Sequence, residues 1–165
     1  MSMMAKFVAL PEPDLVALRA DPERVGDAID HWRHDGPVEQ VLELGKAWHG
    51  VHYLLTGDPD GGEAPLALAI FGGVELGPDL GYGPPRVLEP DEVRDVSAAL
   101  DALPAEALRA RFSPAQFEAA EIYPFGIWAD EGAEVFTWLA HAYHAMQAHY
   151  RQAAANGHAM LLMIT

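Results

Sequence analysis

The chain has 165 residues and a mass of 17.9 kDa, which is the length of one domain with a core of its own. Half of the residues are apolar and 21% are charged, a balance that argues against a disordered or membrane-spanning chain. Cysteine is absent, so disulfides, iron–sulfur clusters, cysteine zinc sites and thiol nucleophiles are excluded. We expect residues 1–165 to form a single domain.

The chain is strongly acidic, with 25 Asp and Glu against 10 Lys and Arg and a formal net charge of −15. Long-range repulsion therefore disfavours nucleic acid and anionic membrane as partners. A basic protein, a cation or a neutral small molecule is compatible with this charge, although the charge is also explained by solubility alone. Protonation of all eight histidines near pH 6.5 would reduce the charge from −15 to −7.

The first residues contain no recognisable targeting segment. The apolar run Phe7–Leu10 stops at Pro11, so it is too short for a signal-peptide core, and no A-x-A cleavage site follows it. No run approaches the roughly 18 consecutive apolar residues of a membrane helix. We expect a cytoplasmic protein.

The start of the chain predicts one strand and two helices. The first apolar run ends at Pro11 and Pro13, which lack the backbone donors of a sheet. Asp21 followed by Pro22 is typical of a helix start. The expected elements are a strand over residues 5–10, a helix over 14–20 and a helix from 22 to the Asp35-Gly36-Pro37 turn.

Apolar residues then recur at steps of three and four between Val41 and Leu55, which indicates an amphipathic helix. Gly45 and Gly50 each weaken this helix by roughly 1 kcal/mol relative to alanine. We therefore place its secure start near Gly45. Residues 39–44 are either extended or helical.

The rest of the chain predicts short helices, one long helix and a closing strand. Ser113 and Gln116 form a capping-box pattern, and Asn156-Gly157 is typical of a left-handed helix end. The last apolar run is typical of a buried central strand. The expected elements are a short helix over 65–71, a loop over 77–86 with a brief strand at 87–88, helices over 90–103, 104–111 and 113–123, a long helix over 131–156 and a strand over 158–165.

These elements predict an α+β fold that is mostly helical, with a small mixed sheet built from the N- and C-terminal strands. The closing strand must pair with another strand, because buried backbone groups need hydrogen-bond partners. The N-terminal strand is the expected neighbour.

The run from Lys46 to Gly57, KAWHGVHYLLTG, resembles the KAWHGIHYLLTG signature of the YfbM-like bacterial proteins. Weaker matches follow in the family's order at residues 81–86, at 121–124 with Trp128, and in the closing helix and strand. The resemblance covers essentially the whole chain. This family is a domain of unknown function, so the resemblance implies a compact α+β fold in the bacterial cytoplasm and no particular activity.

Pairs of histidines three residues apart raise the question of a metal site. On a helix, such a pair shares one face and could share a ligand. No pair is accompanied by a third ligand or by a HExxH motif, so we expect no metal and no cofactor. The pairs are His31 with His34, His49 with His52, and His141 with His144.

Three further residues are candidates for binding. Trp48 either lines a pocket or belongs to the core, and its place in the apolar stripe favours the core. Tyr82 and Arg86 lie in a Gly/Pro-rich loop that we expect to be exposed. The planar guanidinium of Arg86 suits a carboxylate or phosphate, but an ion pair with Glu75 or Asp79 is the simpler interpretation.

Two functions fit these observations. The favoured one is a non-enzymatic binding or protein-interaction module with an acidic surface and an unidentified protein partner. It follows from the charge and from the absence of a G-x-S-x-G or phosphate-loop motif. The alternative is a small hydrolase or transferase that uses His52 or His49 with a carboxylate, such as Glu43 or Glu121, and Arg86. The candidate binding residues are Tyr82, Arg86, His49, His52 and Trp48.

Overall fold

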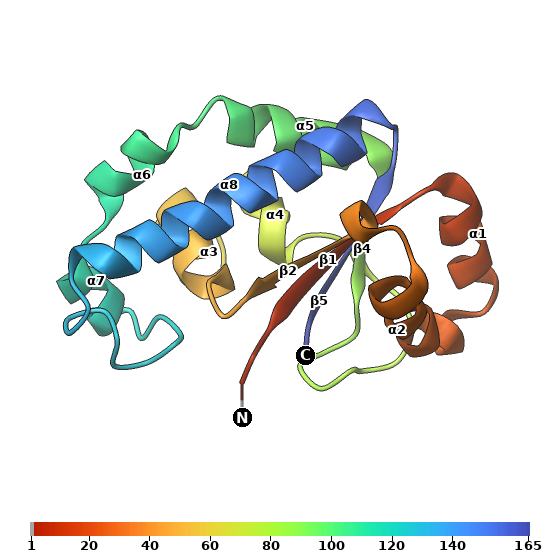
Figure 1. Ribbon diagram of the computed structural model, residues 1–165, viewed down its shortest axis with the longest axis horizontal. Helices are drawn as coiled ribbons and strands as arrows, with labels where there is room; N and C mark the ends of the chain where they lie inside the picture. The colour runs from red at the N-terminus through yellow and green to blue at the C-terminus, as the bar shows by residue number, and fades with distance from the viewer. Residues whose placement is uncertain (1) are drawn as a thin grey trace.

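The computed structural model describes residues 2–165, which form a five-stranded sheet and eight α-helices (Figure 1). Two short 3₁₀ helices, η1 and η2, stand before α2 and β2. The strands are β1 (Ala5–Leu10), β2 (Val41–Gly45), β3 (Val74–Glu75), β4 (Arg86–Leu88) and β5 (Ala159–Ile164). The helices are α1 (Glu12–Ala20), η1 (Pro22–Arg24), α2 (Val25–Asp35), η2 (Val38–Gln40), α3 (Trp48–Thr56), α4 (Leu68–Phe71), α5 (Pro90–Asp101), α6 (Ala105–Arg111), α7 (Pro114–Ala119) and α8 (Ala133–Ala155).

The strand order is β2-β1-β5-β4-β3, so the two terminal strands lie side by side in the middle of the sheet. The expected α+β class and the pairing of the terminal strands are confirmed. The four strand pairs of the described residues are all antiparallel, in place of the mixed pairing we expected. For β1 and β2, the antiparallel pairing follows because the helices after β1 return the chain to the end of the sheet where β1 finishes. β2 therefore starts beside Val8.

Helices cover both faces of the sheet. Alternate residues of the central strands point to opposite faces, and in both strands both sets are buried. Phe7 and Leu162 belong to the core shared with α3, α5 and α8, whereas Val8 and Leu161 belong to the core shared with α1 and α2. Because neither face meets solvent, β5 is apolar throughout instead of alternating with polar residues.

The chain ends are fixed by the same central pair. β1 and β5 are paired over six residues, from Ala5 with Ile164 to Leu10 with Ala159. Beyond that ladder, the backbone N–H of Met4 donates to the carbonyl of Thr165 (2.8 Å), and the N–H of Thr165 donates to the carbonyl of Met4 (3.0 Å). Met4 and Thr165 therefore lie side by side at the same end of the sheet; the course of β1 and β5 can be followed in Figure 1.

Several element boundaries differ from those expected, most notably the starts of α3 and α8. Residues 39–44, which the sequence left open, form part of η2 and most of strand β2, and the helix begins at Trp48 instead of near Gly45. Gly45 has a φ of +66°, a left-handed conformation that favours glycine and turns the chain between strand and helix. The long helix α8 starts at Ala133 instead of residue 131, and Gly132 is its N-cap.

α8 has 23 residues and is therefore about 35 Å long. It crosses the sheet and continues past it, where it packs against α3 and α6 (Figure 1). Over residues 2–165, no helix combines the length and the apolar character needed to span a lipid bilayer.

Gly50 lies where α3 packs tightly against Leu139 of α8. A Cβ atom at this position would lie 2.8 Å from a methyl carbon of Leu139 in α8 and 2.9 Å from the indole of Trp128. Both distances are shorter than a normal van der Waals contact. Glycine at this position is thus required by packing, despite its low helix propensity.

We predict that Gly50→Ala destabilises the protein by about 1–3 kcal/mol, because overpacking outweighs the roughly 1 kcal/mol that alanine adds to a helix. Gly26→Ala is the matched control: Gly26 lies in helix α2, and its added Cβ would meet only Leu80 at 3.7 Å. That variant should be as stable as the wild type or more stable. Urea unfolding of the two variants measures both effects, and a stabilised Gly50→Ala would contradict the packing argument.

Candidate functional site

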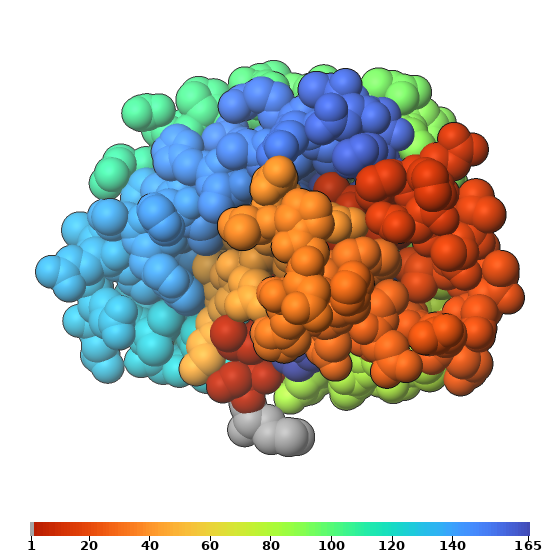
Figure 2. All heavy atoms as spheres, turned by 45° about the vertical axis from the view of Figure 1, so that its right-hand side comes forward, coloured from red at the N-terminus to blue at the C-terminus, as the bar shows by residue number. Residues whose placement is uncertain are grey.

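The ends of three neighbouring strands lie at the same end of the sheet. β1 ends there at Leu10, β5 starts there opposite it at Ala159, and β2 starts there beside Val8. The segments just outside these strands are therefore neighbours, although they are far apart in the sequence. Figure 2 shows this side of the molecule, where the C-terminal end of α8 (dark blue) borders the segment between α2 and β2 (orange).

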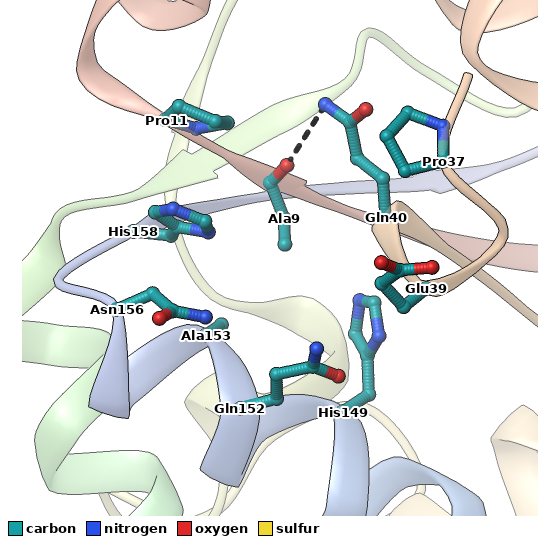
Figure 3. Close-up of a pocket in the computed structure, with 10 residues that line it drawn as sticks. All are labelled: Ala9, Pro11, Pro37, Glu39, Gln40, His149, Gln152, Ala153, Asn156 and His158. Carbon is teal, nitrogen blue, oxygen red and sulfur yellow. Dashed lines mark hydrogen bonds between the residues drawn. The ribbon is translucent and has the colours of Figure 1, made fainter.

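A cavity of about 190 Å³ lies at this edge, between η2, the end of β1 and the last turns of α8 (Figure 3). We call it the strand-end cavity. Its floor is buried, whereas the residues at its mouth are exposed. The apolar lining residues are Ala9, Pro11, Pro37 and Ala153, and the polar ones are Glu39, Gln40, His149, Gln152, Asn156 and His158.

Helix α8 and its C-cap residue supply one wall through a stripe at the spacing i, i+3, i+4, i+7: His149, Gln152, Ala153 and the C-cap Asn156. This spacing places all four side chains on one face of the helix. His149 and Ala153 lie deep, at 8% and 1% exposure, while Gln152 and Asn156 are exposed at the mouth. The wall therefore changes from buried to solvated along the helix.

His149 is the unusual residue of this cavity. Within residues 2–165, its Nε2 atom is buried and has no hydrogen-bond partner. Burial lowers the pKa of the imidazole to about 4, so the ring is uncharged at neutral pH. In Figure 3 the ring rises from α8 toward Glu39 on the opposite wall. Leaving a buried polar atom unpaired typically costs about 1–3 kcal/mol, which makes this imidazole a candidate for contact with a ligand.

The opposite wall is held by Gln40. Its side-chain amide donates to the carbonyl of Ala9 (3.2 Å, dashed in Figure 3) and to the carboxylate of Asp14 (3.3 Å). These bonds tie η2 to β1 and to α1. Glu39, the neighbouring residue, is exposed at the mouth. The cavity is thus bounded by hydrogen-bonded secondary structure on this side.

Trp48 starts helix α3 and is buried at 5% exposure. Its indole N–H donates to the carbonyl of Met3 (3.1 Å). Its ring stacks on His49 at 4.8 Å between centroids and on Tyr123 at 5.9 Å. Trp48 thereby fastens the segment before β1 to the helix.

The two histidines of α3 are buried and bind loop backbone. The Nδ1 of His49 accepts from the N–H of Tyr123 (2.9 Å), so its Nε2 carries the proton and donates to the carbonyl of Pro59 (3.0 Å). The Nε2 of His52 donates to the carbonyl of Gly61 (2.9 Å). Burial lowers the pKa of both rings. Both side chains therefore hold the loop after α3 in place.

Tyr82 is 41% exposed, in the loop where the sequence placed it. Arg86 differs from its expected exposed position, because it is the first residue of β4 and is only half-buried. Its guanidinium donates to the carbonyls of Gly72 (3.0 Å) and Ile70 (3.1 Å) at the end of α4. Burial lowers its pKa. The expected ion pair with Glu75 or Asp79 is replaced by these backbone bonds.

The five residues selected from the sequence are thus not gathered around one cavity. Trp48, His49 and His52 lie together on α3, Arg86 binds the end of α4, and none of these or Tyr82 lines the strand-end cavity. The lining residues were missed because they come from distant segments. One signal was available, since Gln152 and Asn156 extend the stripe of His149 and Ala153 with polar residues.

We predict that Arg86→Met destabilises the protein by about 1–3 kcal/mol, because the carbonyls of Ile70 and Gly72 lose their donors while the apolar stem is kept. Arg151→Met is the control: its ion pair with Asp101 is exposed, so the change should stay within about 0.5 kcal/mol. Thermal unfolding compares the two variants. Equal stabilities would mean that the Arg86 bonds contribute nothing.

We also predict that His149 makes stability fall with falling pH. The folded pKa of about 4 lies below the usual unfolded value of about 6.5. The unfolded chain therefore binds a proton first, and about 3 kcal/mol is lost as the pH falls from about 7 to 4.

The test is urea unfolding of the wild type and of His149→Phe at both pH values. Because His49, His52 and the carboxylates are present in both proteins, they contribute equally, and the variant should lose less stability on acidification. An identical pH dependence would contradict the assignment of this effect to His149.

The comparisons with known proteins agree with this fold. No match to a curated protein was found. The crystal structure of YfbM from Escherichia coli, a protein of unknown function, is similar with a TM-score of 0.77 and 22% sequence identity, covering 98% of this chain and 99% of that one. At this identity the likeness establishes the fold alone. A family model described as a domain of unknown function (DUF1877) matches residues 1–163, and the chain therefore belongs to that family.

Proposed function

We propose that this protein is a non-enzymatic binding protein of the bacterial cytoplasm that holds a small molecule in the strand-end cavity. The observation that carries the proposal is His149, which lines the cavity and whose buried Nε2 lacks a hydrogen-bond partner within residues 2–165. Burying a polar atom without a partner is unfavourable. A ligand that bonds this nitrogen would remove the cost, which supports a binding role.

The enzymatic alternative has less support. His49 and His52 each donate to a loop carbonyl, so neither has a free Nε2 with which to take or give a proton. Glu43, one of the carboxylates considered, bonds Arg33 at 2.7 Å. Arg86 is occupied by the carbonyls of α4. These groups act as structural contacts and do not converge on a reaction centre.

The acidic charge supports a second, separate proposal, namely that a basic protein is a partner. The Escherichia coli relative supports the bacterial source. The small-molecule proposal is the one that a specific cavity supports, so the experiment is directed at that cavity.

We predict that Gln152→Trp abolishes ligand retention. Gln152 is exposed at the cavity mouth, so a large side chain can close the mouth without entering the core. Ala148→Trp is the matched control, because Ala148 is also exposed on α8 but does not line the cavity. Small molecules that stay bound through native purification are released by denaturation and identified by mass spectrometry.

The wild type and Ala148→Trp should retain the same enriched compound, and Gln152→Trp should lack it. If no compound is enriched on the wild type, or if Gln152→Trp retains it equally, the cavity is not a binding site and the proposal is wrong.

A further inference from the structure

The size of the strand-end cavity limits its ligand. Its volume is about 190 Å³, below the roughly 300–1,000 Å³ of pockets that hold drug-sized molecules. A cavity of this size, closed below by Ala9 and Ala153, accepts a molecule of about one or two fused rings. A nucleotide or a peptide would extend well beyond the mouth.

The charges around the cavity disfavour an anion. No lysine or arginine is among the residues that line it, and Glu39 contributes a carboxylate at the mouth. The imidazole of His149 is uncharged at neutral pH, since burial lowers its pKa. An anionic ligand would therefore lose its hydration without gaining a cationic partner. An uncharged ligand avoids this cost.

The distribution of polar groups favours a flat molecule with apolar faces. Pro11 and Pro37 contribute apolar surface on the β1 and η2 sides, and the polar side chains stand around the rim: Glu39, Gln40, His149, Gln152, Asn156 and His158. A sugar carries hydroxyl groups all round, and those that face proline or alanine would lack partners. A planar heterocycle presents apolar faces to such walls and keeps its donors and acceptors on its edge.

We propose that the strand-end cavity binds a small uncharged nitrogen heterocycle with a lactam or amidine edge, the chemistry of a free nucleobase. One edge of the ring bonds Nε2 of His149 at the buried end. The amides of Gln152 and Asn156 pair with the outer edge, as side-chain amides do when they bind adenine through adjacent donor and acceptor atoms. This inference rests on the proposed binding function and specifies the ligand class.

Isothermal titration calorimetry of the purified protein with adenine, uracil and orotate tests the ligand class. Orotate is uracil with a carboxylate, so this pair differs mainly in charge. At least one of the two free bases should bind, and orotate should bind at least about tenfold more weakly than uracil. If neither base binds at millimolar concentration, or if uracil binds and orotate binds as tightly, the inference is wrong.

Two variants then test the residues. His149→Phe keeps a ring of similar size but removes Nε2, and should weaken binding of the base at least about tenfold, while the melting temperature of the free protein stays equal or rises. Gln152→Leu changes an exposed residue, so folding is preserved, and it should weaken binding as well. His149→Gln, which keeps a hydrogen-bonding group, should bind better than His149→Phe. Wild-type affinity in both His149→Phe and Gln152→Leu would overturn the assignment.

The outcomes separate this inference from the proposed function. If the wild type retains a compound of another class and Gln152→Trp loses it, the binding function stands and the heterocycle inference fails. If nothing is retained through purification, the proposed function fails, and this inference, which rests on it, fails with it. Binding of a base that Gln152→Trp and Gln152→Leu leave unchanged would move the site elsewhere on the protein.

Discussion

The burial of β1 and β5 on both faces is the constraint from which the rest of the structure follows. Two adjacent strands with apolar residues on both sides need a layer of helices on each. α1 and α2 supply one layer immediately after β1, and the remaining helices supply the other. A strand of six residues is only about 20 Å long, so the much longer α8 extends beyond the sheet. The part of α8 that lies beyond the sheet is covered by aromatic side chains such as Phe117 and Trp128, whose ring centroids are 4.7 Å apart.

The family signature has a structural explanation of its own. Trp48, His49 and His52 connect helix α3 to the N-terminal segment, to the loop after α3 and to Tyr123. Two arginines form similar bonds to helix ends. Arg86 donates to the carbonyl of Gly72 after α4, and Arg111 donates to the carbonyls of Leu54 and Leu55 near the end of α3. Charged side chains that bond the last carbonyls stabilise short helices. Two of the ten Lys and Arg side chains of the chain thus stabilise the fold. The signature run Lys46–Gly57, through Trp48, His49 and His52, also stabilises the fold.

The elements that the sequence predicted well are those whose local pattern and tertiary role agree. The strand at 5–10, the helix from Pro90 and the closing strand have bounds close to the observed ones because proline, periodicity and apolar runs all point to one structure. The stripe from Val41 to Leu55 was ambiguous, since its first apolar residues belong to an edge strand and the others to α3. Arg86 could not be placed, because its partners are carbonyls 14 and 16 residues away. The strand-end cavity was not predictable for the same reason, as its walls come from segments that only the sheet brings together.

The place of the cavity explains how the protein can keep an unpaired imidazole. His149 lies beside the ends of the two best-buried strands, and its neighbours Met146, Tyr150 and Ala153 are almost fully buried. Such a core has enough favourable packing to tolerate an unsatisfied nitrogen, whose cost is about 1–3 kcal/mol, within a total stability of about 5–15 kcal/mol. Within residues 2–165 it tolerates a second one as well, the buried Nδ1 of His52. An apolar residue at position 149 would remove the cost of the His149 nitrogen and improve the fold. The protein with histidine at position 149 is therefore less stable than this fold could be with an apolar residue there. A ligand that forms a hydrogen bond with the ring would stabilise the folded protein and compensate for that loss.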